Sequence, residues 1–168
     1  IAVVAVKLSW LRGSPQRLLQ QTTASYCILY CPLERYTSLN GTVFMAVDGD
    51  DQPMGFVYVR PMEQGCHVEE LSVLPEHGRK GLGTALMKFV IERAEQMGEF
   101  SVTLATDIHI PWNAPFYAKL GFEPVSPLAL GKEYVELRQI EADNGLDPTR
   151  RQFMVYYLNP VSRNEPSQ

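Results

Sequence analysis

Three glycines and two cations lie between a strand-like run and a helix-like run in "LSVLPEHGRKGLGTALMKFV", residues 71–90. Glycine leaves the backbone N–H groups of a turn accessible, and the first N–H groups of a helix have no acceptor within that helix. Such a loop binds anions, and Arg79 and Lys80 add positive charge beside it. The segment predicts a phosphate site at a helix start, although the loop alone is equally compatible with a turn carrying solvated cations.

The segment matches neither of two well-known phosphate-binding motifs, because it lacks a residue that each of them requires. Gly78 and Gly83 have the spacing of a P-loop, but a Thr-Ala pair follows where that motif needs Lys and then Ser or Thr. A dinucleotide fingerprint needs a third glycine after Gly81 and Gly83, and Leu86 occupies that position. What remains is a side-chain-poor turn that opens a helix.

The elements that must position this loop follow from hydrophobic periodicity. Residues 42–60 predict two antiparallel strands around the polar turn "DGDDQP", and a third strand, residues 66–73, ends before Pro75. An apolar stripe from Leu82 to Met97 predicts a helix that ends at Gly98. Further along, we expect a strand at 101–106, a short helix at 114–121, a helix at 131–143 and a strand at 151–158.

The order of these elements predicts an α/β (α+β) fold in a single domain, residues 1–158. Residues 1–41 are the least legible part, since "QRLLQQTTASYC" is only a short helical pattern. Residues 159–168 are expected to be a disordered tail.

Composition narrows the class of function. Fifteen Lys and Arg against nineteen Asp and Glu give a net charge of -4, which argues against a nucleic-acid partner. We find neither a secretory signal nor a membrane-spanning segment. The three cysteines suit a reducing compartment, so a cytoplasmic location is expected, and Cys27 and Cys31 have no second ligand pair that would make a metal site.

Two motifs taken together resemble a known family. "ELSVLPEHGRKGLGTAL", followed about thirty residues later by "NAPFYAKLGF", resembles the GNAT superfamily of N-acetyltransferases over residues 42–125. The order Gly78-Arg79 exchanges the usual cation and glycine, as in a branch with an "HGRRGIG" loop and a "PWNAPFY" segment. The positions that match the family pattern are Val73, Pro75, Gly81, Gly83, Asn113, Tyr117, Leu120, Gly121 and Phe122.

The resemblance implies a central, mixed but mostly antiparallel sheet flanked by helices, and direct acetyl transfer from acetyl-coenzyme A to an amine. The amine would belong to a small molecule or a peptide, and a homodimer is compatible with the sequence. The backbone edge of Leu71, Ser72 and Val73 would pair with the pantetheine arm. The other expected cofactor-binding residues are Gly78, Arg79, Lys80, Gly81, Leu82, Gly83, Thr84, Asn113 and Phe116.

The reaction needs a proton acceptor, because an ammonium group cannot attack a thioester. Glu69 and Glu70 lie on the third strand, and alternation sends them to opposite faces, so only one is expected to face the acyl group. Glu70 is the slightly favoured base, and a solvated or structurally paired carboxylate is the competing interpretation of each. His67 and His109 are the back-up bases.

The leaving thiolate needs a proton, and the resemblance places Tyr117 at the sulfur. A packed aromatic side chain beside Phe116 is the alternative interpretation of Tyr117. Trp112 and Phe116 could line the acceptor pocket, but a place in the core is expected for both. A non-catalytic acyl-coenzyme A binding module, or a nucleotide-binding domain, would be the competing functions.

Overall fold

The computed structural model describes residues 20–21, 27–31, 41–50 and 52–158, with the backbone alone described for the first two ranges. The chain forms two compact units, residues 1–61 with 68–90 and residues 62–67 with 91–168. The central strand β5 (Gly65–Val73) and the long helix α2 (Leu82–Gln96) each run from one unit into the other.

The first unit contains a run of sequential strands in the order β1-β2-β3-β4-β5. Strands β1 to β4 pair antiparallel with their neighbours. The turn between β3 and β4 is closed by Asp48, whose Oδ1 accepts the backbone N–H groups of Asp50 and Gln52 at 2.9 Å. The hairpin predicted for residues 42–60 is confirmed. The strand bounds are β1 (Gln20–Gln21), β2 (Cys27–Cys31), β3 (Thr42–Val47) and β4 (Pro53–Met62).

Helix α2 packs its apolar stripe within this unit. Phe89 meets Phe44 of β3 edge to face, with ring centroids 5.0 Å apart. The helix ends just before Gly98, whose φ of 73° is the left-handed conformation that glycine adopts readily at helix ends. The predicted helix is confirmed, except that Met97 is exposed. The buried positions of its stripe in this unit include Leu82, Leu86, Phe89 and Val90.

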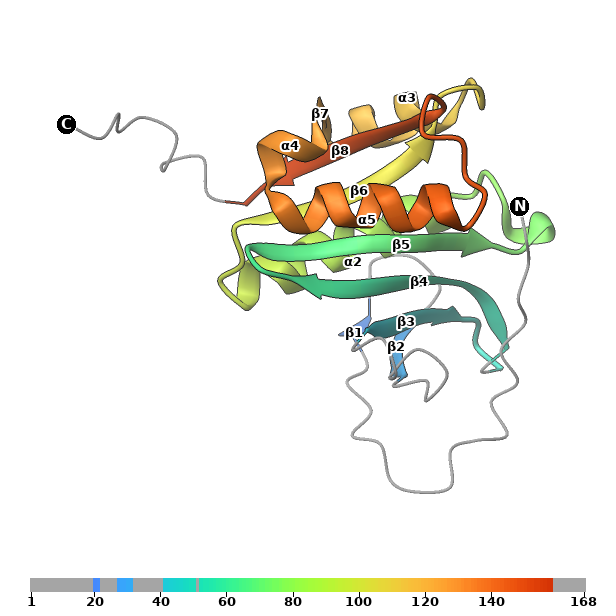
Figure 1. The fold of residues 1–168 in the computed structure, drawn as a ribbon. Helices are drawn as coiled ribbons and strands as arrows, with labels where there is room; N and C mark the ends of the chain where they lie inside the picture. The colour runs from blue at the N-terminus through green and yellow to red at the C-terminus, as the bar shows by residue number, and fades with distance from the viewer. Residues whose placement is uncertain (1–19, 22–26, 32–40, 51, 159–168) are drawn as a thin grey trace. The chain divides into compact units, whose positions relative to one another are not determined.

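The second unit has the strand order β5-β6-β8-β7, with β8 antiparallel to both neighbours. Figure 1 shows α5, in orange, running beside β6 and β8. The predicted strands and helices of this region are confirmed, and the short β7 and α4 were not predicted. The bounds are β6 (Ser101–Asp107), α3 (Asn113–Lys119), β7 (Glu123–Val125), α4 (Pro127–Leu130), α5 (Lys132–Asp143) and β8 (Arg151–Tyr157).

The two faces of β8 carry different neighbours. Tyr134 and Leu137 of α5 form a buried cluster with Phe153 and Met62. Tyr156 instead contacts the ring of Phe122, with centroids 5.6 Å apart. Because residues three apart in a strand point to opposite faces, α5 covers one face of β8 and the ring of Phe122 lies on the other.

Several expectations concern parts of the chain that the structure describes only in part. Gln20–Gln21 form strand β1, so the short helical pattern at that point was misleading. Most of residues 1–41, and the whole of the tail 159–168, lie outside the described residues. None of the helices in the described ranges combines the length and hydropathy that a membrane crossing requires.

Candidate active site

The glycine-rich loop joins β5 to α2 through a 3-10 turn, η2 (Pro75–His77). Arg79 and Gly81 both adopt the left-handed conformation, with φ values of 57° and 85°. The N–H of Ala85 donates to the carbonyl oxygen of Gly81 at 3.0 Å, so the helical hydrogen bonds begin at Gly81. The N–H groups of the next three residues, 82–84, therefore lack acceptors within the helix and are available to an anion.

The loop borders an open space and carries exposed cations. A Cβ atom added to Gly81 would meet no atom of the described structure within 4 Å, so the space beside this glycine is open. Arg79 and Lys80 are both exposed and carry positive charge into the same loop. Leu86, which replaces the third glycine of a dinucleotide loop, is fully buried in the stripe of α2. The phosphate site at this loop stays a prediction.

The exchanged order of Gly78 and Arg79 has a structural cost. Gly78 has the ordinary extended conformation, with φ of -62° and ψ of 153°. Arg79 takes the left-handed conformation, which costs a residue with a side chain about 1–2 kcal/mol. The glycine therefore lies one position before Arg79, the residue whose left-handed conformation glycine would adopt without strain.

Just before the loop, β5 and β4 approach each other closely. A Cβ atom at Gly55 would lie 2.7 Å from the carbonyl oxygen of Ser72, so only glycine permits this approach of the two backbones. The N–H of Leu74 also donates to the carbonyl oxygen of Met54 at 2.9 Å. In the strand order β5 lies between β4 and β6, so the edge at residues 71–73 that would pair with an extended ligand stays a prediction.

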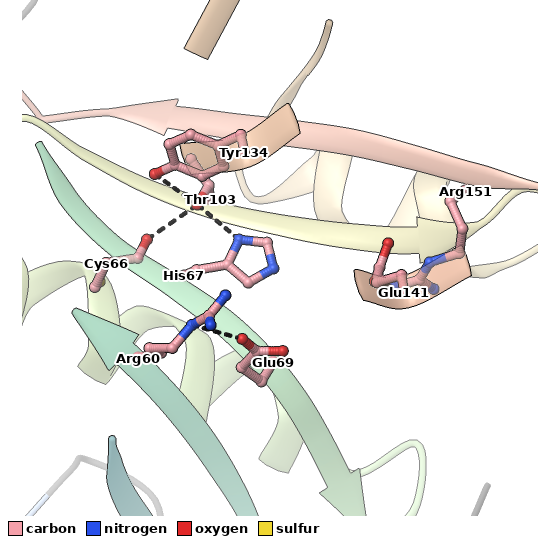
Figure 2. A network of polar contacts seen from close by, with 8 residues as sticks. All are labelled: Arg60, Cys66, His67, Glu69, Thr103, Tyr134, Glu141 and Arg151. Carbon is pink, nitrogen blue, oxygen red and sulfur yellow. Dashed lines mark hydrogen bonds and ion pairs between the residues drawn. The ribbon is translucent and has the colours of Figure 1, made fainter. Parts of the chain in front are cut away.

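The two neighbouring glutamates of β5 have different environments. The Nε atom of Arg60 lies 2.9 Å from Oε1 of Glu69, and both side chains are about a quarter exposed (Figure 2). Burial raises the pKa of the Glu70 carboxyl above its usual value. The ion pair stabilises the charged form of Glu69, whereas burial destabilises the charged form of Glu70.

His67 is buried, with 1% of its surface exposed. Its Nδ1 lies 2.9 Å from Oγ1 of Thr103, which in turn lies 3.3 Å from the hydroxyl of Tyr134 (Figure 2). The ring also packs against Phe153, with centroids 5.9 Å apart. These contacts favour a structural role over that of a back-up base. His109 is exposed, and its backbone N–H donates to Asp107.

Helix α3 carries the residues of the second motif. Asn113 and Tyr117 are four residues apart in this helix and therefore lie on one face of it. The ring of Tyr117 packs edge to face against Phe116 and Phe122, at 5.0 and 6.1 Å between centroids. Burial raises the pKa of the Tyr117 hydroxyl, and the charge of Arg151 opposes that rise. Tyr117 is therefore a neutral proton donor at physiological pH.

Trp112 was predicted to lie in the core, and this was wrong, because 67% of its surface is exposed. It precedes α3, and its carbonyl oxygen accepts the N–H of Phe116 at 3.0 Å. Phe116 is partly buried against Tyr117. An exposed tryptophan one turn before Phe116 is a candidate contact for an acceptor molecule.

The predicted site residues fall into two groups. The first unit holds both glutamates, the strand edge and the whole loop, and the second unit holds Asn113, Phe116 and Tyr117. Sequence reasoning missed Arg60 beside Glu69 and the pair of Arg151 with Glu141. Their partners lie on other elements, so the first pair depends on the register of β4 and β5 and the second on how α5 packs on β8.

No metal centre is present among the described residues, since no three His, Cys, Asp or Glu side chains gather there. Cys66 is a free, buried cysteine. Burial, with the Glu99 carboxylate close by, raises the pKa of its thiol, which makes it a poor nucleophile.

Solved structures of acetyltransferases share this fold. A GNAT family acetyltransferase from Elizabethkingia anophelis, solved with acetyl-CoA bound, is 15% identical with a TM-score of 0.58, over 74% of this chain and 80% of the other. The ribosomal-protein-S18-alanine N-acetyltransferase from Escherichia coli is 17% identical with a TM-score of 0.56, over 82% and 84%. PaiA N-acetyltransferase from Thermoplasma acidophilum, in complex with coenzyme A, is 17% identical with a TM-score of 0.54, over 73% and 65%.

The sequence model of the Acetyltransferase (GNAT) family matches residues 9–122. The match includes the glycine-rich loop, both glutamates, Asn113 and Tyr117, and it ends at Phe122. Because this match covers more than half of the 168 residues, the chain belongs to the Acetyltransferase (GNAT) family.

Proposed function

We propose that the protein transfers an acetyl group from acetyl-coenzyme A directly to an amine. The observation that carries the proposal is the loop opening α2, whose left-handed Arg79 and Gly81 present the free N–H groups of the first helical turn beside an open space. Relatives with the same fold were solved with coenzyme A or acetyl-CoA. Acetyl-coenzyme A would supply the acetyl thioester.

The loop and the preceding strand would bind this co-substrate. Backbone N–H groups of residues 82–84 would donate to the pyrophosphate, and Thr84 would add its hydroxyl. Arg79 and Lys80 would offset the phosphate charge. The edge of residues 71–73 would pair with the amides of the pantetheine arm as an added strand does.

Glu70 is the proposed general base. A substrate amine with a pKa of about 10 is mostly protonated at neutral pH, so a carboxylate must remove a proton, directly or through one water molecule, before the nitrogen can attack. The raised pKa of Glu70 brings it nearer to the operating pH, which makes proton transfer more efficient. Glu69, whose charge is stabilised by Arg60, is the less suitable acceptor.

Tyr117 is the proposed general acid. Its hydroxyl would donate a proton to the sulfur of the leaving thiolate while the acyl group passes to the amine. Because its pKa is raised by burial, the hydroxyl keeps its proton throughout the neutral range. The backbone N–H of Val73 or Leu74 would meet the developing oxyanion.

The acceptor is proposed to be an amine of a small molecule or a peptide. Relatives of the same fold carry names as different as a ribosomal-protein alanine acetyltransferase and nourseothricin acetyltransferase. The net charge of -4 weakly favours a cationic acceptor. We further propose that the protein has a single catalytic domain, can form a homodimer and is located in the cytoplasm. The free, buried Cys66 suits such a reducing compartment.

A screen of acceptor amines with acetyl-coenzyme A, read out as free thiol, tests the function. We expect thiol release that depends on both protein and amine. If calorimetry detects tight coenzyme A binding but no amine of the panel accelerates thiol release, the protein is an acyl-coenzyme A binding module. A nucleotide-binding domain would require ATP or NAD to compete with coenzyme A for the same site, and calorimetry that detects binding of neither would exclude that function.

A further inference from the structure

Helix α3, which carries Tyr117, has few contacts of its own that hold it in place. It has seven residues, and isolated helices shorter than about 12 residues are marginal in water. None of these residues, all of which the structure describes, is buried, and no described side chain caps the start of the helix. The ring of Tyr117 packs against the buried Phe122 just after the C-terminal end. The start of α3 must therefore be placed by contacts outside the helix.

Asp107, the last residue of β6, holds the connection that leads to α3. Its Oδ1 accepts the N–H of His109 at 2.8 Å, and its carbonyl oxygen accepts the N–H of Ile110 at 3.3 Å. The carbonyl oxygen of Ile110 in turn accepts the N–H of Asn113, the first residue of α3, at 3.1 Å. A series of hydrogen bonds thus joins Asp107 to the start of the helix.

Arg150, in the connection between α5 and β8, fixes Asp107 from the other side. Its Nη2 donates to Oδ2 of Asp107 at 2.7 Å, and its carbonyl oxygen accepts the N–H of Ile108 at 2.9 Å. The N–H of Arg150 donates to the carbonyl oxygen of Asp147 at 3.0 Å. The two connections are therefore tied together by side chains and by backbone. Arg150 lies outside the residues that match the family model, which end at Phe122.

The pair of Asp107 and Arg150 is charged at neutral pH. The N–H of His109, and then the Arg150 guanidinium, hold the pKa of the Asp107 carboxyl below its usual value. The side chains of Arg150 and Asp107 are 43% and 23% exposed, and ion pairs in contact with water add little to the stability of a whole protein. We therefore expect the pair to act on local geometry.

We propose that Asp107, held by Arg150, is a positioning residue that fixes the start of α3 and, through it, the place of the Tyr117 hydroxyl. The effect on catalysis rests on the proposed acetyl transfer, whereas the effect on α3 does not. A proton donor must lie within hydrogen-bond reach of the atom that receives the proton, so a small displacement lowers the rate. Without the pair, Tyr117 would be chemically unchanged but poorly placed.

Hydrogen exchange, measured residue by residue with NMR, tests the placement of α3 without any catalysis. The amides to follow are those of Phe116 and Phe122, which donate to backbone carbonyl oxygens at 3.0 and 3.1 Å. Asp107→Ala removes both side-chain contacts, so we expect it to speed the exchange of these amides several-fold. Amides in the middle of α2 should exchange as they do in the parent protein.

Milder variants grade the effect. Asp107→Asn and Arg150→Gln remove the ion pair but keep an acceptor for the N–H of His109, so their exchange rates should lie between those of the parent and Asp107→Ala. Arg150→Lys keeps the positive charge and should stay closest to the parent. The matched control is Glu136→Gln, which removes the exposed ion pair of Glu136 with Lys132 at 3.1 Å in α5. It should exchange as the parent does.

A double-mutant cycle tests whether the pair acts through Tyr117. Asp107→Ala should lower kcat about tenfold, with the Kd of coenzyme A unchanged because the loop of residues 78–84 is untouched. In the Tyr117→Phe background the same substitution should lower kcat no further, since the group that it positions is gone. Arg150→Lys should keep most of the kcat that Arg150→Gln loses.

Two results would overturn the inference. One is exchange of the α3 amides at the parent rate in Asp107→Ala, and the other is a loss of kcat that persists in full in the Tyr117→Phe background. If Asp107→Ala fails to fold, Asp107→Asn and Arg150→Gln give the same comparisons, with smaller effects in the same direction. Failure of the proposed acetyl transfer would show separately, because the parent protein would then release no thiol, whereas the exchange rates would still report on α3.

Discussion

Arg60 of β4 and Glu69 of β5 form an ion pair, with 2.9 Å between Nε and Oε1, and β5 also carries the partly buried Glu70. The pair stabilises the charged form of Glu69, and Glu70 is the proposed base. Glu70→Gln should lower kcat about a hundredfold at neutral pH, with coenzyme A affinity unchanged. Glu69→Gln is the matched control and should lower it less than about threefold. The reverse ranking in steady-state kinetics would assign the base to Glu69.

The pH dependence of activity follows from the raised pKa of Glu70. The base must be ionised, so activity is lost as the pH falls through that raised value. The acidic limb of the kcat profile should therefore lie above the ordinary range of a glutamate, and it should disappear in Glu70→Gln. A parent profile that stays flat down to the usual pKa of glutamate would contradict this assignment.

Folding stability should respond to the same group with a defined sign. Burial raises the pKa of Glu70 in the folded state above its unfolded value, so the folded protein binds the proton more tightly. The cost of burying the charge is absent below the unfolded pKa and reaches its full value above the folded pKa. Glu70→Gln should accordingly raise the melting temperature at neutral pH but not at acidic pH. An equal rise in melting temperature at neutral and at acidic pH would mean that the gain in stability does not come from the ionisation of Glu70.

Arg79→Gly should separate stability from binding. The left-handed conformation of Arg79 is strained, and glycine removes that strain at the expense of greater freedom in the unfolded chain. We expect the free energy of unfolding to rise by about 0.5 kcal/mol, measured in urea. Coenzyme A affinity should fall, because the loop loses a cation. Unchanged affinity in calorimetry would place the guanidinium in solvent.

Gly83→Asp should likewise weaken coenzyme A binding without lowering stability. An acidic residue in the first turn of α2 interacts favourably with the helix dipole, and glycine is a poor helix former, so the variant should be at least as stable as the parent. The new carboxylate would repel the pyrophosphate, and the Kd of coenzyme A should rise tenfold or more. Gly83→Asn provides the neutral control. If both variants bind coenzyme A as the parent does, the phosphate group lies elsewhere.

The sequence predicts the elements that have strong periodicity or clear punctuation. The stripe of α2 begins after Gly81 and ends before Gly98, and both glycines are left-handed in the structure. In contrast, β7 has three residues, one of them Pro124, and its pairing with β8 depends on a partner about thirty residues away. Such a short edge strand has no pattern of its own that periodicity could reveal.

The parts of the candidate site that depend on backbone conformation could be predicted from the sequence. The pairs of side chains from different elements could not. The loop of residues 78–84 follows from glycine chemistry and its place before a helix. Arg60 beside Glu69 depends on strand register, and Arg151 beside Ala105 depends on both register and the reach of a long side chain. Trp112 was placed in the core by its hydrophobicity alone, which took no account of its position before a helix at the surface.

The most direct test of acetyl transfer combines mass spectrometry of the acceptor with thiol release in the same reaction. With the best amine from the screen, the account predicts one acetylated amine for each thiol released. It also predicts at least a tenfold lower rate for both products in Tyr117→Phe, at unchanged coenzyme A affinity. Thiol release without an acetylated amine, or full activity of Tyr117→Phe, would contradict the account.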